Sequence, residues 1–115
     1  MNKRKIGAEY EQKAVQYLET TGYRILDRNY RCRIGEIDII AVHRGYLCFI
    51  EVKYRSNLSL GYPEEAVDYR KQQTIIRTAQ HYMKKKGISF DTSCRFDVVA
   101  MEGEEIRLIQ NAYTL

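Results

Sequence analysis

Apolar residues recur at helical spacing in two segments of the chain. In the first segment a single face is apolar and Gly22 closes the pattern, which predicts a helix over residues 8–21. In the second segment Pro63 suits a first helical turn and Gly87 suits a helix end, which predicts a helix over residues 63–86. The two apolar stripes consist of Ala14, Val15 and Leu18, and of Ala66, Ile75, Ile76, Ala79, Tyr82 and Met83.

Five further segments have the alternating or continuous apolar pattern of β-strands. Arg44-Gly45 and Glu102-Gly103-Glu104 fall between consecutive segments and predict tight turns. The strands are expected at residues 23–30, 34–42, 46–54, 95–101 and 106–113. The order α-β-β-β-α-β-β predicts an α/β fold with a central mixed five-stranded sheet flanked by helices, in a single domain over residues 1–115.

A two-residue turn at Arg44-Gly45 would fix the register of the strands on either side of it. His43 then faces Tyr46, and the pairs on one face of the hairpin are Val42–Leu47, Ile40–Phe49, Asp38–Glu51 and Glu36–Lys53. The other face carries Ile37–Val52, Ile39–Ile50 and Ala41–Cys48. Since both faces are apolar near the turn, the hairpin is expected at the centre of the sheet.

The first of these faces becomes polar at its far end, where Asp38 is expected opposite Glu51. Directly opposed Cβ atoms lie roughly 4.5–5.5 Å apart, and two carboxylates at that distance repel unless a cation lies between them. Lys53 is one such cation. A divalent metal is another, and magnesium suits the place because it needs only one or two protein carboxylates. The alternative is a structural ion-pair cluster of Glu36 and Glu51 with Lys53 that merely ends the strands.

The first predicted helix adds a third carboxylate. Glu11 falls on the apolar stripe of this helix, whereas Glu9 falls on its polar face. A carboxylate is costly to bury without a partner. We therefore expect Glu11 to point towards the Asp38–Glu51 end of the sheet.

The composition bears on the protein's partners and cellular location, but it does not indicate an activity. The 115 residues carry a net charge of +4, which suits a nucleic-acid partner but does not establish one. Cys32, Cys48 and Cys94 lack the spacing of a metal clip and are expected to be reduced thiols in a cytoplasmic protein. No apolar run is long enough to span a bilayer, so no membrane association is expected.

Two segments resemble a known nuclease signature. Gly35-Glu36-Ile37-Asp38 followed by Phe49-Ile50-Glu51-Val52-Lys53 looks like the motif of the PD-(D/E)xK nuclease superfamily, which has the restriction-endonuclease-like fold. Ile37 stands where the superfamily's name has a proline, which is dispensable across that superfamily. Over nearly its whole length the chain resembles the YraN-like family, which it also matches at Gly7, Glu11, Ala14, Gly22-Tyr23, Pro63 to Val67 and Arg95-Phe96-Asp97.

The YraN-like family is similar to archaeal Holliday-junction resolvases, which use a helix Glu, a strand Asp and an E-x-K motif to bind metal and cut DNA. The resemblance implies that Asp38, Glu51 and Glu11 bind Mg²⁺ or Mn²⁺ and that Lys53 is the catalytic lysine. It also implies a nuclease that hydrolyses phosphodiester bonds of DNA, including branched or damaged DNA. Two alternatives stay open: a nucleic-acid-binding module that keeps the fold but does not cut, and a purely structural or partner-binding domain.

Basic residues outside the motif are candidate contacts to phosphate. Arg31 and Arg33 follow the first strand, where they could neutralise a nucleic-acid backbone or simply form a solvated basic surface. Related nucleases often place a Gln or Lys on the long helix facing the site, and the resemblance assigns this place to Lys71 and Gln72. A homodimer would suit a symmetric junction, although the sequence selects no surface for one.

Overall fold

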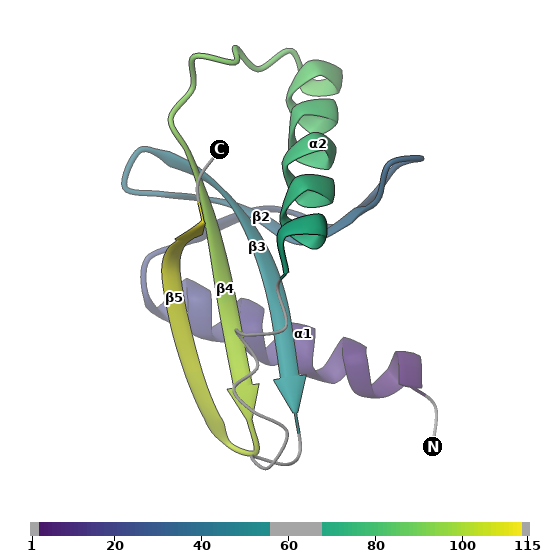
Figure 1. The fold of residues 1–115 in the computed structure, drawn as a ribbon. Helices are drawn as coiled ribbons and strands as arrows, with labels where there is room; N and C mark the ends of the chain where they lie inside the picture. The colour runs from purple at the N-terminus through teal and green to yellow at the C-terminus, as the bar shows by residue number, and fades with distance from the viewer. Residues whose placement is uncertain (1–2, 56–67, 114–115) are drawn as a thin grey trace.

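The computed structural model describes residues 3–55 and 68–113. Its elements in chain order are α1 (Lys3–Thr20), β1 (Arg24–Arg31), β2 (Glu36–His43), β3 (Tyr46–Arg55), α2 (Tyr69–Lys86), β4 (Cys94–Glu102) and β5 (Glu105–Tyr113), as Figure 1 shows. The predicted order α-β-β-β-α-β-β is confirmed.

The five strands form one sheet in the order β1-β2-β3-β4-β5. All neighbouring pairs are antiparallel except β3 and β4, which are parallel. Parallel neighbours require a crossover connection, and α2 lies in the chain between these two strands. The predicted mixed sheet is therefore confirmed.

The two helices cover opposite faces of the sheet and enclose two separate cores (Figure 1). The core on the α1 side contains the predicted stripe of the first helix, packed on Ile39, Ala41, Cys48 and Ile50. The core on the α2 side contains the predicted stripe of the second helix, packed on Ile40, Phe49, Phe96 and Val98. Ala66, which the sequence also placed in that stripe, lies outside the described residues.

Both helices begin at residues other than those predicted. α1 already starts at Lys3, ahead of the expected residue 8. The expected start of the second helix, Pro63, lies outside the described residues, but α2 itself begins at Tyr69. Asp68 has an extended backbone there, and its carboxylate accepts a hydrogen bond from the Lys71 N–H at 2.8 Å, which is the geometry of an N-cap. At the other end Gly87 closes α2 in the left-handed conformation, as predicted.

The hairpin between β2 and β3 has the predicted register over its apolar half. Pairing runs from His43–Tyr46 to Ile39–Ile50 without a shift. Arg44 and Gly45 have φ angles of 51° and 85°, and two consecutive left-handed residues make the turn that matches the twist of the flanking strands.

Strand alternation breaks in β2 at Asp38. Ile37 belongs to the core on the α2 side and Ile39 to the core on the α1 side, although regular alternation would put both on one face. The adjacent strand breaks in the same place, since Arg28 contacts α1 whereas Tyr30 contacts α2, with Asn29 between them at a φ of 53°. Asp38 lies at this break and lines a cavity together with Gly7 and Glu11 of α1.

Two predictions about the hairpin are wrong because of this break. Asp38 does not pair with Glu51: its carboxylate accepts from the backbone N–H of Val52, and Glu51 contacts Lys71 of α2. Glu36 does not lie opposite Lys53 either; it pairs with Arg31 of β1, by backbone register and by an ion pair of 3.0 Å. The described pairing of β2 with β3 ends at Ile39–Ile50, so the two strands diverge just where the acidic residues begin.

Neither helix of the described chain is long and apolar enough to cross a membrane. All three cysteines are free thiols, with Cys48 buried and the other two half-buried.

Candidate functional site

A cavity of about 460 Å³ lies where β2 and β3 diverge, on the side of the sheet that α1 covers. Its wall includes Glu11 from α1, Asp38 from β2, and Val52 and Tyr54 from β3. The structure therefore brings two of the three predicted metal ligands, Glu11 and Asp38, to one cavity from separate elements.

Asp38 lines this cavity and is hydrogen-bonded to the neighbouring strand. Its Oδ2 accepts a hydrogen bond of 2.8 Å from the backbone N–H of Val52, in place of a backbone acceptor. Burial, together with the negative charge of Glu51, raises the pKa of Asp38 to about 7, although the bond from Val52 acts in the opposite direction. Glu11 and Glu36 add to the rise. A cation bound nearby would favour the ionised form of such a carboxylate.

Glu11 is buried to 9% exposure, as its place on the apolar stripe predicted, and it has partners on β1. Its Oε1 accepts a hydrogen bond of 2.8 Å from Asn29 Nδ2 and lies 3.5 Å from Arg28 Nε. The break in β1 at Asn29 thus supplies the polar partner that a buried carboxylate needs.

Glu51 lies on the α2 side, where two lysines surround one of its oxygens. Its Oε1 is 3.4 Å from Lys53 Nζ and 3.3 Å from Lys71 Nζ. Partial burial alone would lower the pKa of Lys71, but the carboxylate of Glu51, with Asp38 and Glu36 behind it, raises that pKa instead. The lysine predicted on the long helix therefore contacts the acidic residue of the motif.

The remaining basic candidates differ in their surroundings. Arg31 lines the cavity but is paired with Glu36. Arg33 is exposed in the connection between β1 and β2. Gln72 lies next to Lys71 near the start of α2 and is half-buried.

The donor set fits a hard divalent cation. Within residues 3–55 and 68–113 no three His, Cys, Asp or Glu side chains stand close enough together to hold a metal by themselves. Magnesium does not require three, since it is typically bound through one or two carboxylates and keeps several waters. Asp38 and Glu51 offer two carboxylates near the strand separation, and the negative charge of Glu51 is one cause of the raised pKa of Asp38.

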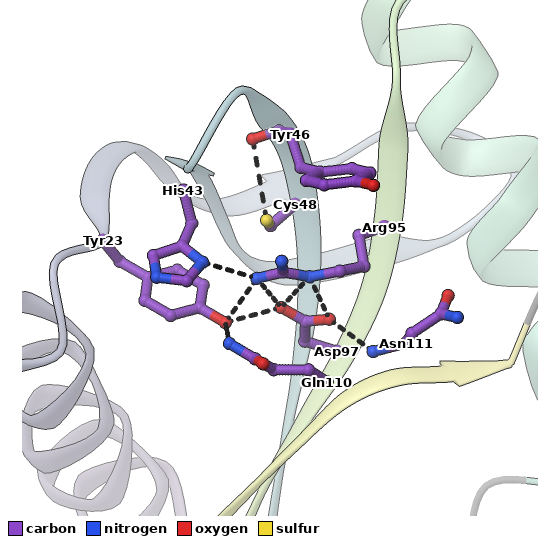
Figure 2. A network of polar contacts seen from close by, with 8 residues as sticks. All are labelled: Tyr23, His43, Tyr46, Cys48, Arg95, Asp97, Gln110 and Asn111. Atoms are coloured by element: carbon purple, nitrogen blue, oxygen red, sulfur yellow. Dashed lines mark hydrogen bonds and ion pairs between the residues drawn. The ribbon is translucent and has the colours of Figure 1, made fainter.

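A second polar cluster is buried near the other end of the hairpin, and the sequence did not reveal it (Figure 2). At its centre, Arg95 Nε lies 3.0 Å from Asp97 Oδ1, and Arg95 Nη2 donates to Tyr23 Oη at 2.7 Å and pairs with His43 Nδ1 at 2.9 Å. Tyr23 also donates to Asp97, and its ring stacks on His43 with centroids 4.1 Å apart. Burial raises the pKa of Tyr23 and lowers that of His43.

Asp97 has a structural role in this cluster. Its Oδ1 accepts a hydrogen bond of 2.9 Å from the backbone N–H of Asn111, where the register between β4 and β5 shifts. The side chain thus replaces a backbone acceptor at the irregular position. The sequence signal that could have revealed the cluster is the pair Arg95 and Asp97, two residues apart in an otherwise apolar strand and therefore on one face.

The fold and the site define a mixed α/β domain with acidic residues on α1, β2 and β3 near the point where the pairing of β2 with β3 ends, and with lysines of β3 and α2 on one of these acids. The model of Uncharacterised protein family UPF0102 matches residues 10–101, and the chain belongs to this family.

Relatives extend the match to nearly the full chain. A UPF0102 protein of Lachnoclostridium phytofermentans is 54% identical over 113 residues, covering 98% of this chain and 96% of the relative. A UPF0102 protein of Alkaliphilus oremlandii is 51% identical over 116 residues, covering 100% and 94%. A UPF0102 protein of Persephonella marina is 46% identical over 109 residues, covering 95% and 93%.

Proposed function

We propose that the protein is a metal-dependent nuclease of the PD-(D/E)xK type that hydrolyses phosphodiester bonds of DNA, with branched or damaged DNA among its substrates. One observation carries the proposal. Asp38 of β2 and the pair Glu51 and Lys53 of β3 lie beyond the last paired residues, Ile39 and Ile50, on the side away from the turn. Two carboxylates and an ammonium, of which Glu51 and Lys53 are in contact, are thus placed near the point where the strand pairing ends.

Mg²⁺ or Mn²⁺ would be held by Asp38 and Glu51, with Glu11 completing the set directly or through water. A bound metal supplies Lewis-acid polarisation of the scissile phosphate and a water of lowered pKa. The protonation state of Asp38 bears on this metal binding. Asp38 must be deprotonated to bind, and its pKa of about 7 means that metal binding near neutral pH releases a proton.

The lysines have two roles in this scheme. Without metal, Lys53 and Lys71 balance the buried charge of Glu51. With metal and substrate in place, an ammonium freed from this pairing can donate to a phosphate oxygen and stabilise the charge that develops there. Lys53 is the catalytic candidate, because it lies on the same strand as Glu51 and is less exposed than Lys71.

The second candidate function is a nucleic-acid-binding module that does not cut. Its support is that each carboxylate already has a partner within the chain, together with the net charge of +4. DNA as the partner, a homodimer on a symmetric substrate and a cytoplasmic location belong to the proposal as well.

A paired measurement separates the two functions. Calorimetry with Mn²⁺ and incubation with branched, single-stranded and double-stranded DNA are carried out on the same preparation. The nuclease proposal predicts saturable Mn²⁺ binding, lost in Asp38→Asn and kept in Glu104→Gln, an exposed acid in the β4–β5 turn. DNA binding without either metal binding or cleavage would favour the binding module.

A further inference from the structure

The cavity that contains Asp38 is walled on one side by an aromatic ring. We propose that Tyr54 is a stacking platform for an unpaired base, so that the preferred substrate carries an unpaired nucleotide next to the phosphate that is cut. The inference rests on the proposed nuclease function and names its substrate class.

Tyr54 is stacked on another ring and is still partly exposed. Its ring stacks on Tyr10 of α1 with centroids 4.2 Å apart and an interplanar angle of 11°. Lys13 Nζ lies 5.5 Å from the centre of the Tyr10 ring, so a cation supports the pair. Tyr54 nevertheless stays 40% exposed. A rigid, partly exposed aromatic ring loses little entropy when a second flat group packs on it.

The ring belongs to the same cavity as the proposed metal ligand. Tyr54 lies two residues after Val52 on β3, so both point to the α1 side, and the Val52 N–H is the group that holds Asp38. A base on Tyr54 would therefore place its own phosphate near the Asp38 carboxylate. The cavity volume of about 460 Å³ lies in the range of small-molecule sites, which suits one nucleotide and is too small for a duplex.

The charges around the cavity favour a strand that is anchored by stacking. Arg28 and Arg31 line it, but Arg28 is paired with Glu11 and Arg31 with Glu36. Arginines that already pair with carboxylates attract phosphate less strongly than free ones do. These two arginines alone would therefore discriminate poorly between single-stranded and duplex DNA. Bases within a duplex have both faces covered by their neighbours, and a protein ring can stack only on a base outside that stack.

Binding to DNA in EDTA tests the platform separately from cleavage. The probes are a single strand, a duplex with a one-nucleotide bulge that carries 2-aminopurine, and the fully paired duplex. The proteins are wild type, Tyr54→Phe, Tyr54→Ala and Phe90→Ala; Phe90 is a 66% exposed aromatic residue that does not line this cavity. Anisotropy gives affinity, 2-aminopurine quenching reports stacking, and a thermal melt confirms that each variant is folded.

Wild type, Tyr54→Phe and Phe90→Ala are expected to bind the bulged duplex and the single strand more tightly than the paired duplex and to quench 2-aminopurine. Tyr54→Ala should lose roughly tenfold in affinity for the bulged duplex, with little change for the paired one. Equal binding of all three probes by the wild type, or the absence of quenching, overturns the platform even if Tyr54→Ala fails to fold.

The outcomes also separate this inference from the nuclease proposal. Quenching that depends on Tyr54, without cleavage in Mg²⁺ or Mn²⁺, supports the platform and rejects the nuclease. Metal-dependent cleavage that is the same in wild type and a folded Tyr54→Ala rejects the platform and keeps the nuclease. If an acidic peptide displaced the bulged DNA from the protein as effectively as unlabelled bulged DNA does, the site would bind a protein ligand instead, and the inference would be contradicted.

Discussion

Asp38 is the residue at which the fold and the proposed chemistry meet. The Glu-x-Lys spacing of Glu51 and Lys53 could be read from the sequence, because strand alternation puts both on one side, and their contact of 3.4 Å agrees with it. The direction of Asp38 could not be read in this way. It depends on a break in alternation that β1 and β2 share, and a pattern within one strand contains no information about its neighbour.

The raised pKa of Asp38 predicts how stability depends on pH in the metal-free protein. The pKa rises from an ordinary 3.8 to about 7, so between these values the folded state holds a proton that the unfolded state has lost. Stability should therefore fall as pH rises from about 4 to about 7. Asp38→Asn removes the charge but keeps an oxygen that can accept from Val52.

Unfolding in urea with EDTA should show Asp38→Asn equal to wild type near pH 5 and more stable by about 2 kcal/mol near pH 8. The control is Glu104→Gln, an exposed carboxylate that should have no such pH profile. Equal stability of Asp38→Asn and wild type at both pH values would show that ionisation of Asp38 does not destabilise the folded protein.

Gly35 gives a second prediction at the scale of one residue. A Cβ at this position would lie 2.8 Å from Thr74 Cγ2 and 3.1 Å from Thr78 Oγ1, so the connection between β1 and β2 presses directly on α2. Gly35→Ala should lower the free energy of unfolding by about 2 kcal/mol, measured by urea denaturation.

Gly7→Ala is the matched control for Gly35→Ala. Gly7 lies in α1, and among the described residues a Cβ there would meet only the Tyr54 hydroxyl at 3.9 Å, an ordinary contact. It should leave stability unchanged or raise it by up to about 1 kcal/mol. A Gly35→Ala protein as stable as wild type would mean that the connection can move away from α2.

At the scale of elements, the sequence predicted well what depends on local pattern. The turn at Arg44-Gly45 set the β2–β3 register, and the apolar stripes set the faces of both helices. The predicted start of α2 was wrong, because the helix begins after the cap at Asp68, which the apolar pattern did not reveal. The polar cluster around Arg95 was missed because its members come from four separate regions of the chain.

That cluster ties β4 to β2, β5 and the residue before β1, and it should contribute strongly to stability. Asp97 is 0% exposed and accepts from Arg95, Tyr23 and the Asn111 backbone. Asp97→Asn would leave the Arg95 guanidinium without its buried counter-charge, and we expect a loss of about 3 kcal/mol in the free energy of unfolding.

Tyr23→Phe removes one hydrogen bond from the same cluster without unbalancing its charge. It should lower the free energy of unfolding by only about 1 kcal/mol in the same urea titration. If Asp97→Asn were no more damaging than Tyr23→Phe, the cluster would not depend on the Arg95–Asp97 charge pair.

At the scale of the whole molecule, the sequence alone predicted the fold and the strands and helices that carry the proposed site. Strand and helix order predicted the mixed sheet, and the family match over residues 10–101 covers the segments that carry the proposed site. What the order of elements does not contain is the separation of β2 from β3 beyond Ile39–Ile50. Because the strands separate there, Asp38 lines a cavity. In a continuous hairpin, Asp38 would have faced Glu51 and Glu36 would have faced Lys53.

Cleavage of end-labelled DNA by matched proteins tests the proposed activity most directly. Wild type, Asp38→Asn, Lys53→Met and the control Glu104→Gln are assayed side by side on branched and single-stranded DNA, in Mg²⁺, in Mn²⁺ and in EDTA. We expect metal-dependent products from wild type and Glu104→Gln, no products in EDTA, and a rate at least roughly a hundredfold lower for Asp38→Asn and Lys53→Met. Cleavage that persists in EDTA or in Asp38→Asn, or no cleavage by the folded wild type on any substrate, would contradict the nuclease assignment.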